Sequence, residues 1–551
     1  MEVAGSEPDR APALPPVVRA MLDPAFYPGG PRNVRLVQTH ISYVFLAGAE
    51  VFKIKKPVRF SFLDFSTLER RRHFCGDEVR LNRSLTTDVY LGVVAICPDG
   101  AGFRIGEEGD PDAVEYAVRM KRLPADRMFS EILARGEAAD RHVQAIARRL
   151  VDFHAGADGG PEVAANGSPE ALLAVLANDF SESHRYRGRT ISDDDDRAIQ
   201  DFLSDFVATR ASFLRCRQEG GHIREGHGDL RAEHICFADE LQIIDCVEFD
   251  ARFRRRDVAA EVAFLAMDIE HLGHPALARS LVERYAQDSS DPDLAWLVPF
   301  YQCYFAYIRG KVDSLTGAEV EVGEADRAHA EQSARRHFAQ AYRYTWTYSP
   351  MLIVVGGLSG SGKTTIARAL RERVGFGHVN SDIVRKELTG HATDRPAPAE
   401  AKPFLYAAEQ SRRTYERMHD LAREELARGR GVIVDATFQR RVDRAAIREL
   451  AYARKVPILF VECRCDEEEI RRRLDRRVRS GTGASDADWD VYRAQVANYE
   501  SFPLSEADTH VVVRSTDPLP AILAQIEAAA RRRLSKNMNL PSANQPARGG
   551  S

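Results

Sequence analysis

The chain lacks any apolar run long enough for a membrane helix. Its longest apolar stretches, such as residues 351–356, fall far short of the roughly 20 residues that such a helix needs. The N-terminal segment MEVAGSEPDR is acidic and contains no apolar core, so no signal peptide is expected. These absences predict a cytoplasmic protein with no membrane partner.

Cysteine and net charge are also low. Eight of the 551 residues are cysteine and none forms a C-x-x-C pair, so the usual zinc-knuckle spacing is missing. We therefore expect free thiols in a reducing compartment. The formal net charge is only −5, from 77 basic and 82 acidic residues, which argues against broad nucleic-acid binding. The 44% hydrophobic content is that of an ordinary globular protein.

Composition and periodicity divide the chain into two large parts between tails. We predict disordered tails at residues 1–20 and 535–551, which are rich in Pro, Ala and polar residues. The first part begins with short apolar runs separated by turns, which is typical of an antiparallel sheet, and then becomes mostly helical in period. The predicted domains are 21–345, with a small lobe at about 30–120 and a helical lobe at about 125–345, and 346–534.

The second part alternates strand and helix from residue 351 onward. Five apolar strands separated by helices indicate a parallel, doubly wound sheet. In such a sheet, ligands bind beyond the carboxyl ends of the strands. The strands are expected at residues 351–356, 376–380, 431–434, 457–462 and 510–514.

The segment GLSGSGKT, residues 357–364, directly follows the first of these strands and precedes a helical pattern. It matches G-x-x-x-x-G-K-[ST], in which the glycines let the backbone wrap a phosphate closely. We predict that Lys363 contacts the β/γ-phosphates and acts in catalysis, and that the Thr364 hydroxyl ligates Mg²⁺. The predicted cofactor-binding residues here are Gly357, Leu358, Ser359, Gly360, Ser361, Gly362, Lys363, Thr364 and Thr365.

Two further strand ends carry acidic residues. Asp435 ends the run GVIV and is a candidate Mg²⁺ ligand through water, with a helix N-cap as the alternative. Asp382, in NSDIVRKEL, is placed to accept a proton from a substrate hydroxyl. Arg385 lies three residues later and is a candidate to bind the substrate. For this pair the alternative is an N-cap with a local ion pair.

An arginine-rich helix follows, with the sequence RRRLDRRVR at residues 471–479. Arg473 and Arg477 are spaced i, i+4 and are candidates to close over the phosphates, although a solvated face is the alternative. With GLSGSGKT, NSDIVRK and VIVDATF, this helix makes residues about 350–530 resemble the small P-loop kinases of the gluconate kinase and polynucleotide 5′-hydroxyl kinase type. The resemblance implies phosphoryl transfer to a small acceptor.

A second pair of motifs lies in the first part of the chain: HGDLRAEHI at 227–235 and IIDCVEFD at 243–250. Asp229 and Asp245 are 16 residues apart, each beside a short apolar run. Two such carboxylates can divide phosphoryl transfer, one orienting the acceptor hydroxyl and the other holding Mg²⁺. The alternative is a buried loop with N-capping Asp residues.

These motifs resemble the aminoglycoside phosphotransferase and choline kinase branch of the protein-kinase-like fold, whose usual form is HGDxHxxN followed by a strand and an Asp. The resemblance implies that Asp229 is catalytic and that Asp245 binds metal. His234 stands at the Asn position, and imidazole is a poorer partner for hard Mg²⁺ than an oxygen ligand. His234 is thus a metal ligand or acts by hydrogen bond, with Glu248 and Asp250 as acidic residues that can compensate.

Upstream, the strand-like segment VFKIKKPVRF places Lys53 and Lys55 on one face. The resemblance implies that one strand lysine contacts the nucleotide phosphates and pairs with a helix glutamate. We favour Lys53 over Lys55, and Glu78 over Glu69. Residues 119–124 are expected to connect the two lobes.

The whole chain resembles bifunctional proteins that fuse an aminoglycoside phosphotransferase-like domain to a P-loop domain. The predicted fold class is multidomain α/β, with a bilobal α+β protein-kinase-like domain followed by a doubly wound P-loop kinase domain. The implied function is a phosphotransferase with two nucleotide sites that uses ATP and Mg²⁺ on hydroxyl groups of small-molecule acceptors. The alternatives are a catalytic P-loop domain fused to a degenerate sensing module, a polynucleotide 5′-hydroxyl kinase-like enzyme, or an ATP-driven switch for a macromolecular partner.

Lysine is scarce as well, since only ten of the 77 basic residues are lysine. Such a bias toward arginine is typical of GC-rich bacterial genes. Lys53, Lys55 and Lys363 are three of the ten. A compact ammonium group fits between phosphate oxygens where a planar guanidinium does not, so the composition points to the same residues as the motifs.

Overall fold

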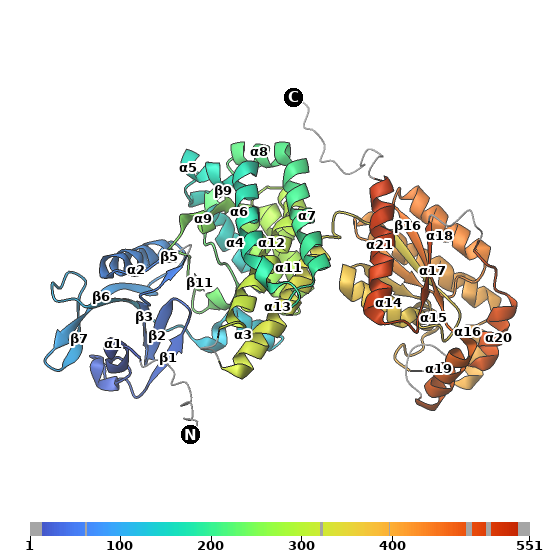
Figure 1. The fold of residues 1–551 in the computed structure, drawn as a ribbon, viewed down its shortest axis with the longest axis horizontal. Coiled ribbons are helices and arrows are strands. Elements are labelled where there is room, and N and C mark those ends of the chain that lie inside the picture. The colour runs from blue at the N-terminus through green and yellow to red at the C-terminus, as the bar shows by residue number, and fades with distance from the viewer. Residues whose placement is uncertain are drawn as a thin grey trace, which may run out of the picture. The chain divides into compact units, whose positions relative to one another are not determined.

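The computed structural model describes residues 14–60, 63–319, 323–395, 397–480, 487–502 and 509–537. The chain forms two compact units: unit 1, Met1–Ala341, and unit 2, Tyr342–Ser551 (Figure 1). Among the described helices, none combines the length and the apolar character that a bilayer crossing requires.

Unit 1 begins with a six-stranded antiparallel sheet of strand order β1-β2-β3-β8-β6-β7. Helix α2 packs on this sheet through Cys75 and Val79, which contact the cluster around Val118 of β8. The Thr67 hydroxyl caps α2 by accepting a hydrogen bond from the N–H of Arg70. The elements are β1 (Val34–Gln38), β2 (Ser42–Ala47), β3 (Glu50–Lys55), β4 (Arg59–Phe60), β5 (Leu63–Asp64), α2 (Leu68–Asn82), β6 (Tyr90–Asp99), β7 (Gly102–Glu107) and β8 (Glu115–Lys121).

Strand β3 separates its side chains by alternation. Phe52 and Ile54 are buried in an apolar cluster with Phe45 on one face of the sheet. Lys53 and Lys55 therefore point to the opposite face, where α2 lies. The ammonium groups of both lysines thus lie beneath α2. Burying them without a counter-charge is unfavourable, so a carboxylate is needed on that helix.

The predicted disordered N-terminus is wrong for residues 16–20, which form helix α1 (Pro16–Ala20). Val18 and the following Met21 are buried in the same cluster as Phe52. Burial of these apolar side chains against the sheet compensates for ordering the segment, and Pro16 favours a helix start. The remainder of the predicted tail, residues 1–13, lies outside the described residues.

The larger lobe of unit 1 is helical around two short antiparallel ribbons. Strand β9 pairs with β12, and β10 pairs with β11. The motif loop 227–234 leaves β9 and enters β10, and Asp245 follows β11. The ribbons are β9 (Ile223–Glu225), β10 (Ile235–Phe237), β11 (Leu241–Ile243) and β12 (Arg255–Asp257). The helices are α3 (Phe129–Ala134), α4 (Asp140–Gly156), α5 (Pro161–Ala164), α6 (Pro169–Ser183), α7 (Asp193–Thr209), α8 (Ala211–Glu219), α9 (Ala251–Arg254), α10 (Val258–His271), α11 (Pro275–Asp288), α12 (Leu294–Thr316) and α13 (Glu324–Tyr344).

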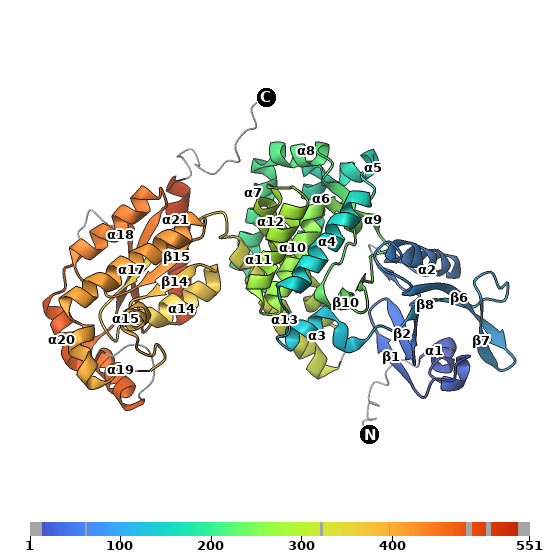
Figure 2. The same cartoon turned by 180° about the vertical axis from the view of Figure 1, so that it is seen from behind.

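Unit 2 contains a five-stranded parallel sheet of order β14-β15-β13-β16-β17. Leu352 and Val354 of β13 pack on α17 and α18, while Ile353 and Val355 are equally buried on the other face. Helices therefore cover both faces (Figure 2). The strands are β13 (Leu352–Gly356), β14 (Gly377–Asn380), β15 (Val432–Asp435), β16 (Ile458–Arg464) and β17 (His510–Arg514). The helices are α14 (Lys363–Val374), α15 (Ser381–Thr389), α16 (Lys402–Leu405), α17 (Ala408–Ala427), α18 (Arg441–Ala453), α19 (Glu467–Ser480), α20 (Trp489–Ala497) and α21 (Leu519–Asn537).

The predicted fold class is confirmed: a bilobal α+β unit precedes a doubly wound parallel-sheet unit, and all five expected strands of unit 2 are present. The tail predicted from residue 535 begins too early, because α21 continues to Asn537. Its buried Ile522 and Ile526 anchor the helix to the unit, and the helix carries on past them. Residues 538–551 of the predicted tail lie outside the described residues.

Candidate active sites

The P-loop of unit 2 adopts a backbone that only glycine allows. Gly357, Gly360 and Gly362 have φ angles of 152°, 81° and 87°. A Cβ atom on Gly357 would lie 2.7 Å from the carbonyl oxygen of Cys463. The loop connects β13 to α14, which begins at Lys363. Backbone N–H groups and a helix N-terminus therefore meet at one point, an arrangement that binds phosphate.

The side chains of the loop divide between packing and solvent. Leu358 packs against the apolar cluster that joins α19 and α20, and Ser361 is fully buried. Thr364 is half-buried in the first turn of α14, and Thr365 beside it is exposed. Leu358 and Ser361 thus hold the loop in shape, while the loop N–H groups, the Lys363 ammonium group and the Thr364 hydroxyl remain available to a ligand.

Asp435 lies beside the P-loop at the carboxyl end of β15. It is fully buried, and its Oδ2 accepts a hydrogen bond from Asn380 Nδ2 at 2.6 Å. Burial raises the pKa of this carboxyl, but His378, the charge of Lys363 and the Thr364 hydroxyl outweigh burial and lower it. The structure therefore brings Asp435, Lys363 and Thr364 together. An N-cap role for Asp435 is wrong, because the next helix, α18, begins six residues later.

Asp382 and Arg385 form an ion pair on α15, with 2.8 Å between Asp382 Oδ1 and Arg385 Nη1. Asn380, rather than Asp382, caps the helix, since its Oδ1 accepts the N–H groups of Asp382 and Ile383 at 3.0 and 3.1 Å. The N-cap alternative for Asp382 is therefore wrong, whereas the predicted ion pair is present. The Arg385 guanidinium is buried and stacks on the Tyr406 ring, 4.7 Å from its centroid. A fixed carboxylate and a fixed cation thus lie at one strand end.

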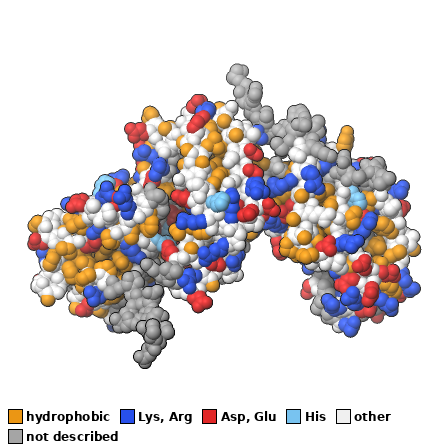
Figure 3. All heavy atoms as spheres, viewed as in Figure 1, with side chains coloured by type: hydrophobic (Ala, Val, Ile, Leu, Met, Phe, Trp, Pro, Cys, Tyr) orange, Lys and Arg blue, Asp and Glu red, His pale blue; other side chains and the backbone are white. Residues whose placement is uncertain are grey.

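Arg473 of α19 reaches the P-loop. Its Nη1 lies 3.5 Å from the Gly360 carbonyl oxygen and donates to Ser515 Oγ at 2.8 Å. The Glu469 carboxylate holds its Nε at 2.8 Å. Arg477 lies one turn further along the same helix. Side chains of both signs crowd the region of α19 (Figure 3), and the helix has six arginines and four acidic residues.

Sequence reasoning missed two residues that contact this loop. Gln495 of α20 accepts a hydrogen bond from the Ser359 N–H at 2.8 Å. Ser515, just after β17, lies against Arg473, and its Cβ would be 2.9 Å from a Cβ on Gly362. Neither residue belongs to a recognisable spacing. The position of Ser515 at a strand end was the only sequence signal that could have found it.

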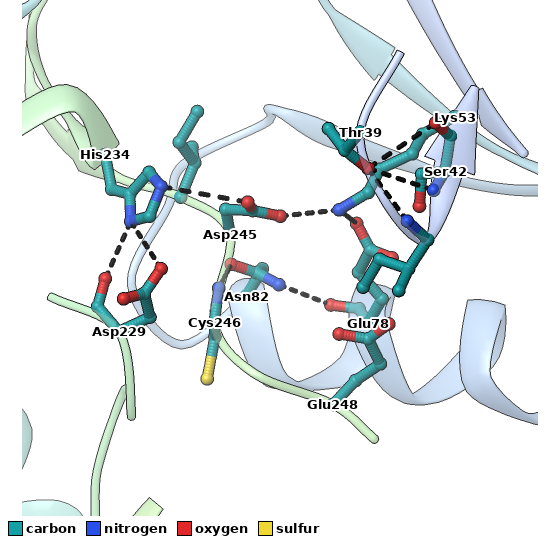
Figure 4. A network of polar contacts seen from close by, with 12 residues as sticks. Thr39, Ser42, Lys53, Glu78, Asn82, Asp229, His234, Asp245, Cys246 and Glu248 are labelled. Carbon is teal, nitrogen blue, oxygen red and sulfur yellow. Dashed lines mark hydrogen bonds and ion pairs between the residues drawn. The ribbon is translucent and has the colours of Figure 1, made fainter. Parts of the chain in front are cut away.

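Unit 1 holds a compact charge cluster under α2 (Figure 4). Lys53 Nζ contacts Asp245 Oδ1 at 2.5 Å and Glu78 Oε1 at 2.9 Å. Lys55 Nζ contacts the other oxygen of Glu78 at 2.8 Å and also pairs with Glu248. Lys55 is completely buried, whereas the side chain of Lys53 keeps 14% exposure. Glu69 lies exposed on the outer surface of α2, so Glu78 is the glutamate that meets the lysines.

Asp245 is held in an unusual conformation that aims its carboxylate at Lys53. Its φ of 67° is left-handed, which costs energy for any residue other than glycine. Its N–H donates to the Tyr90 hydroxyl at 3.1 Å, and the next N–H, of Cys246, donates to Asn82 Oδ1 at 2.9 Å. Burial raises the pKa of Asp245, but the charge of Lys53 lowers it well below its usual range. Tyr90 and Asn82 were not anticipated, because their role depends on non-local packing.

The motif loop 227–234 is fixed by its own hydrogen bonds. The Gly228 N–H donates to Glu261 Oε1 at 2.7 Å, and His234 Nδ1 lies 2.7 Å from the Asp229 carbonyl oxygen. The Asp229 carboxylate accepts from Arg231 Nε and Nη2 at 3.1 and 3.0 Å. Burial raises the pKa of Asp229, but Arg231 outweighs burial and lowers it to about 2. Arg231 was not singled out from the sequence.

The expectation that Glu248 or Asp250 compensates at the metal site is wrong. Glu248 is buried and pairs with Lys55, which also donates to Glu78. Asp250 caps α9 by accepting from the N–H of Arg252 at 2.9 Å, and it also binds that guanidinium. Both carboxylates are therefore used in structure, and the alternative of N-capping Asp residues applies to Asp250 alone.

Comparisons with known proteins find matches to separate parts of the chain. Residues 352–502 match the sequence model of a family described as an AAA domain. A gluconokinase of Gluconobacter oxydans is 29% identical over 131 residues, which cover 23% of this chain and 66% of that protein. Among solved structures, a gluconokinase from Sinorhizobium meliloti covers 35% of this chain and 97% of its own, with 20% identity and a TM-score of 0.26. The GDP complex of aminoglycoside 2′-phosphotransferase-IIIa covers 58% and 97%, with 13% identity and a TM-score of 0.37.

A longer relative spans both units. An uncharacterised protein of Mycobacterium tuberculosis is 31% identical over 461 residues, which cover 84% of this chain and 89% of that protein. That alignment is longer than either unit, so it includes residues of both. The chain therefore belongs to the same family as this mycobacterial protein, and in it a bilobal α+β unit precedes a unit that carries the P-loop on a parallel sheet.

Proposed function

We propose that the chain is an ATP-dependent phosphotransferase with one nucleotide site in each unit, acting on hydroxyl groups of small acceptors. The observation that carries this proposal is the meeting of Lys363, Thr364 and Asp435 at the glycine loop of unit 2. Binding of Mg²⁺-ATP requires a backbone that holds phosphate, an ammonium group such as that of Lys363, and oxygen ligands such as those of Thr364 and Asp435.

In unit 2, the loop backbone and Lys363 bind the β- and γ-phosphates, and Arg473 lies against the same loop. Thr364 and Asp435 suit Mg²⁺, because Asp435 Oδ1 is buried without a hydrogen-bond partner among the described residues. When bound, Mg²⁺ neutralises charge on the phosphates. Asp382 accepts the proton of the acceptor hydroxyl, and Arg385 binds an anionic or polar group of the acceptor.

In unit 1, Lys53 binds the nucleotide phosphates and is positioned by Glu78. Asp245 and His234 are the candidate metal ligands, since an oxygen of one faces a ring nitrogen of the other. Asp229 orients the acceptor hydroxyl once Arg231 releases it. These roles are supported by the contacts of Lys53 with Glu78 and Asp245 and by the facing side chains of His234 and Asp245.

Lys363→Ala is expected to reduce phosphoryl transfer by unit 2 by about two orders of magnitude or more, because the phosphates lose their cation. The measurement is a screen of metabolite extracts for ATP-dependent phosphorylated products, with Lys455→Ala as the matched control at an exposed lysine of the same unit. Turnover that survives Lys363→Ala belongs to unit 1 and should disappear on adding Asp229→Ala. Unchanged unit 2 products in the Lys363→Ala protein would contradict the assignment.

A second candidate function for unit 1 is nucleotide sensing without catalysis. The bidentate Arg231 pair favours it, because both oxygens of Asp229 are already used. Under this alternative, Asp229→Ala leaves every phosphorylated product unchanged while ATP binding to unit 1 persists. The same screen, combined with equilibrium dialysis of ATP against the Lys363→Ala protein, separates the two functions.

A further inference from the structure

The hydrogen bond of His234 determines which of its two ring nitrogens faces the site as an acceptor. Its Nδ1 lies 2.7 Å from the backbone carbonyl oxygen of Asp229, and a carbonyl can only accept. Nδ1 therefore carries a proton, which in a neutral imidazole leaves a lone pair on Nε2. Such a hydrogen bond is the usual device that orients a metal-binding histidine.

This Nε2 atom faces a carboxylate oxygen. Asp245 Oδ2 lies 3.8 Å from Nε2, while Lys53 contacts the other oxygen, Oδ1. Two acceptor atoms at that separation repel each other unless a cation lies between them. Arg231 Nη2 approaches Nε2 at 3.5 Å, a long contact, and the same atom is committed to Asp229 at 3.0 Å.

Both groups are positioned before any ligand arrives. The His234 side chain has 9% exposure, whereas that of Asp245 has 46%, so the pair opens to solvent from the Asp245 side. Tyr90 and Asn82 fix the backbone of 245–246. Among the described residues, no three His, Cys, Asp or Glu side chains converge as a metal site. Two protein ligands plus nucleotide phosphates and water are typical of nucleotide-bound metals.

We propose that His234 and Asp245 form a metal site in unit 1 that prefers a divalent transition-metal ion, such as Mn²⁺, over Mg²⁺. This inference rests on the proposed nucleotide site of unit 1. Mg²⁺ favours oxygen ligands and binds imidazole poorly, whereas imidazole nitrogen is a good ligand for first-row transition metals. His234 provides a ring nitrogen at the position where the resembled family has an amide oxygen. This difference changes the metal preference of the site and leaves Lys53, the proposed phosphate-binding lysine, in place.

The test uses the full chain carrying Lys363→Ala, so that ADP binds in unit 1, with Mn²⁺ as the probe. Pulsed EPR is expected to show a ¹⁴N coupling from a directly bonded imidazole. His234→Asn should abolish that coupling and shift the ratio of Mn²⁺ to Mg²⁺ affinity toward Mg²⁺ on the order of tenfold. His73→Asn, at an exposed histidine of the same unit, should change neither quantity.

The outcomes separate the inference from the function on which it rests. Binding of Mn²⁺-ADP without a ¹⁴N coupling, and with a metal preference that His234→Asn does not alter, would overturn the inference and leave the nucleotide site standing. Absence of ADP binding to the Lys363→Ala protein would overturn both. His234→Gln provides a second variant, and circular dichroism of both variants shows whether loss of the coupling reflects a lost ligand or a lost fold.

Discussion

At the scale of single residues, one carboxylate organises the site of unit 1. Glu78 contacts Lys53 through one oxygen and Lys55 through the other. Lys55 is fully buried and also pairs with Glu248, so its ammonium group stays within the protein. Lys53 shares Asp245 instead and remains partly exposed. The alternation of side chains along β3 places both lysines on the same face. Their carboxylate partners differ, so Lys53 remains accessible to a ligand and Lys55 does not.

The ion pair between Asp229 and Arg231 leads to a prediction about how stability and activity depend on pH. Since the pKa of Asp229 in the folded protein, about 2, lies below its unfolded value, its charge stabilises the fold above roughly pH 4 and this contribution is lost as pH falls toward 2. Arg231→Gln removes the cation that outweighs burial, so the pKa of Asp229 should rise. A ¹³C NMR titration of the carboxyl group measures this, and the acid limb of unit 1 activity should move to higher pH with it.

Arg252→Gln is the matched control, because Arg252 makes a similar bidentate pair with Asp250 on the surface. It should leave the titration of Asp229 unchanged. If Arg231→Gln leaves the Asp229 titration in place, Arg231 is not the group that keeps the carboxylate ionised.

At the scale of elements, the P-loop of unit 2 is enclosed by segments distant in sequence. Helix α19 contributes Arg473, the end of β17 leads to Ser515, and α20 contributes Gln495. The glycines are needed because these neighbours leave no room for a Cβ atom: one on Gly360 would lie 2.9 Å from Ile470. The conformation of the loop thus depends on its glycines with positive φ angles and on the elements that pack against it.

Gln495→Ala is expected to loosen the contact between α20 and the P-loop. The Ser359 N–H loses its acceptor, and a hydrogen bond of this kind contributes about 1 kcal/mol. Amide hydrogen exchange at Ser359 should therefore accelerate about five- to tenfold. Gln525→Ala, which removes a hydrogen bond from α21 to the Val512 carbonyl, should leave exchange at Ser359 unchanged. Equal protection in both variants would show that α20 does not hold the loop.

At the scale of the whole molecule, the chain joins two units that each have their own core. The helices of unit 1 pack around buried α10 and α12, and unit 2 packs around its parallel sheet. The relative in Mycobacterium tuberculosis matches across both, so the combination is a property of the family. The two proposed nucleotide sites are therefore expected to respond to ligand separately.

Calorimetry tests that expectation. ADP with a divalent metal at 100 times its Kd should stabilise each unit by about 2.7 kcal/mol, a shift in Tm of about 4 °C for unit 1 and about 6 °C for the smaller unit 2. Lys363→Ala should cancel the shift of one unfolding transition, and Asp245→Asn the shift of the other. A variant that cancels both shifts would mean that the units do not bind nucleotide independently.

The sequence by itself determined the features that depend on local pattern. The five strands of unit 2, the P-loop between β13 and α14, and the two lysines on one face of β3 all follow from periodicity and short motifs. The helix at residues 16–20 escaped prediction because its stability comes from burial against a sheet and not from its own composition. Local signals are short-range, so they specify elements and motif loops.

The tertiary structure alone decided which charges meet. Lys53 and Glu78 lie far from Asp245 along the chain, and their contacts arise because α2 and the segment after β11 pack near the same face of the sheet. His234 and Asp245 are only 11 residues apart, and the β10–β11 ribbon brings them together. The same packing gave Glu248 and Asp250 structural partners in place of the metal role expected of them. The strength of an electrostatic interaction depends on the distance between the charged groups and on their burial. The spacing of residues along the sequence specifies neither quantity.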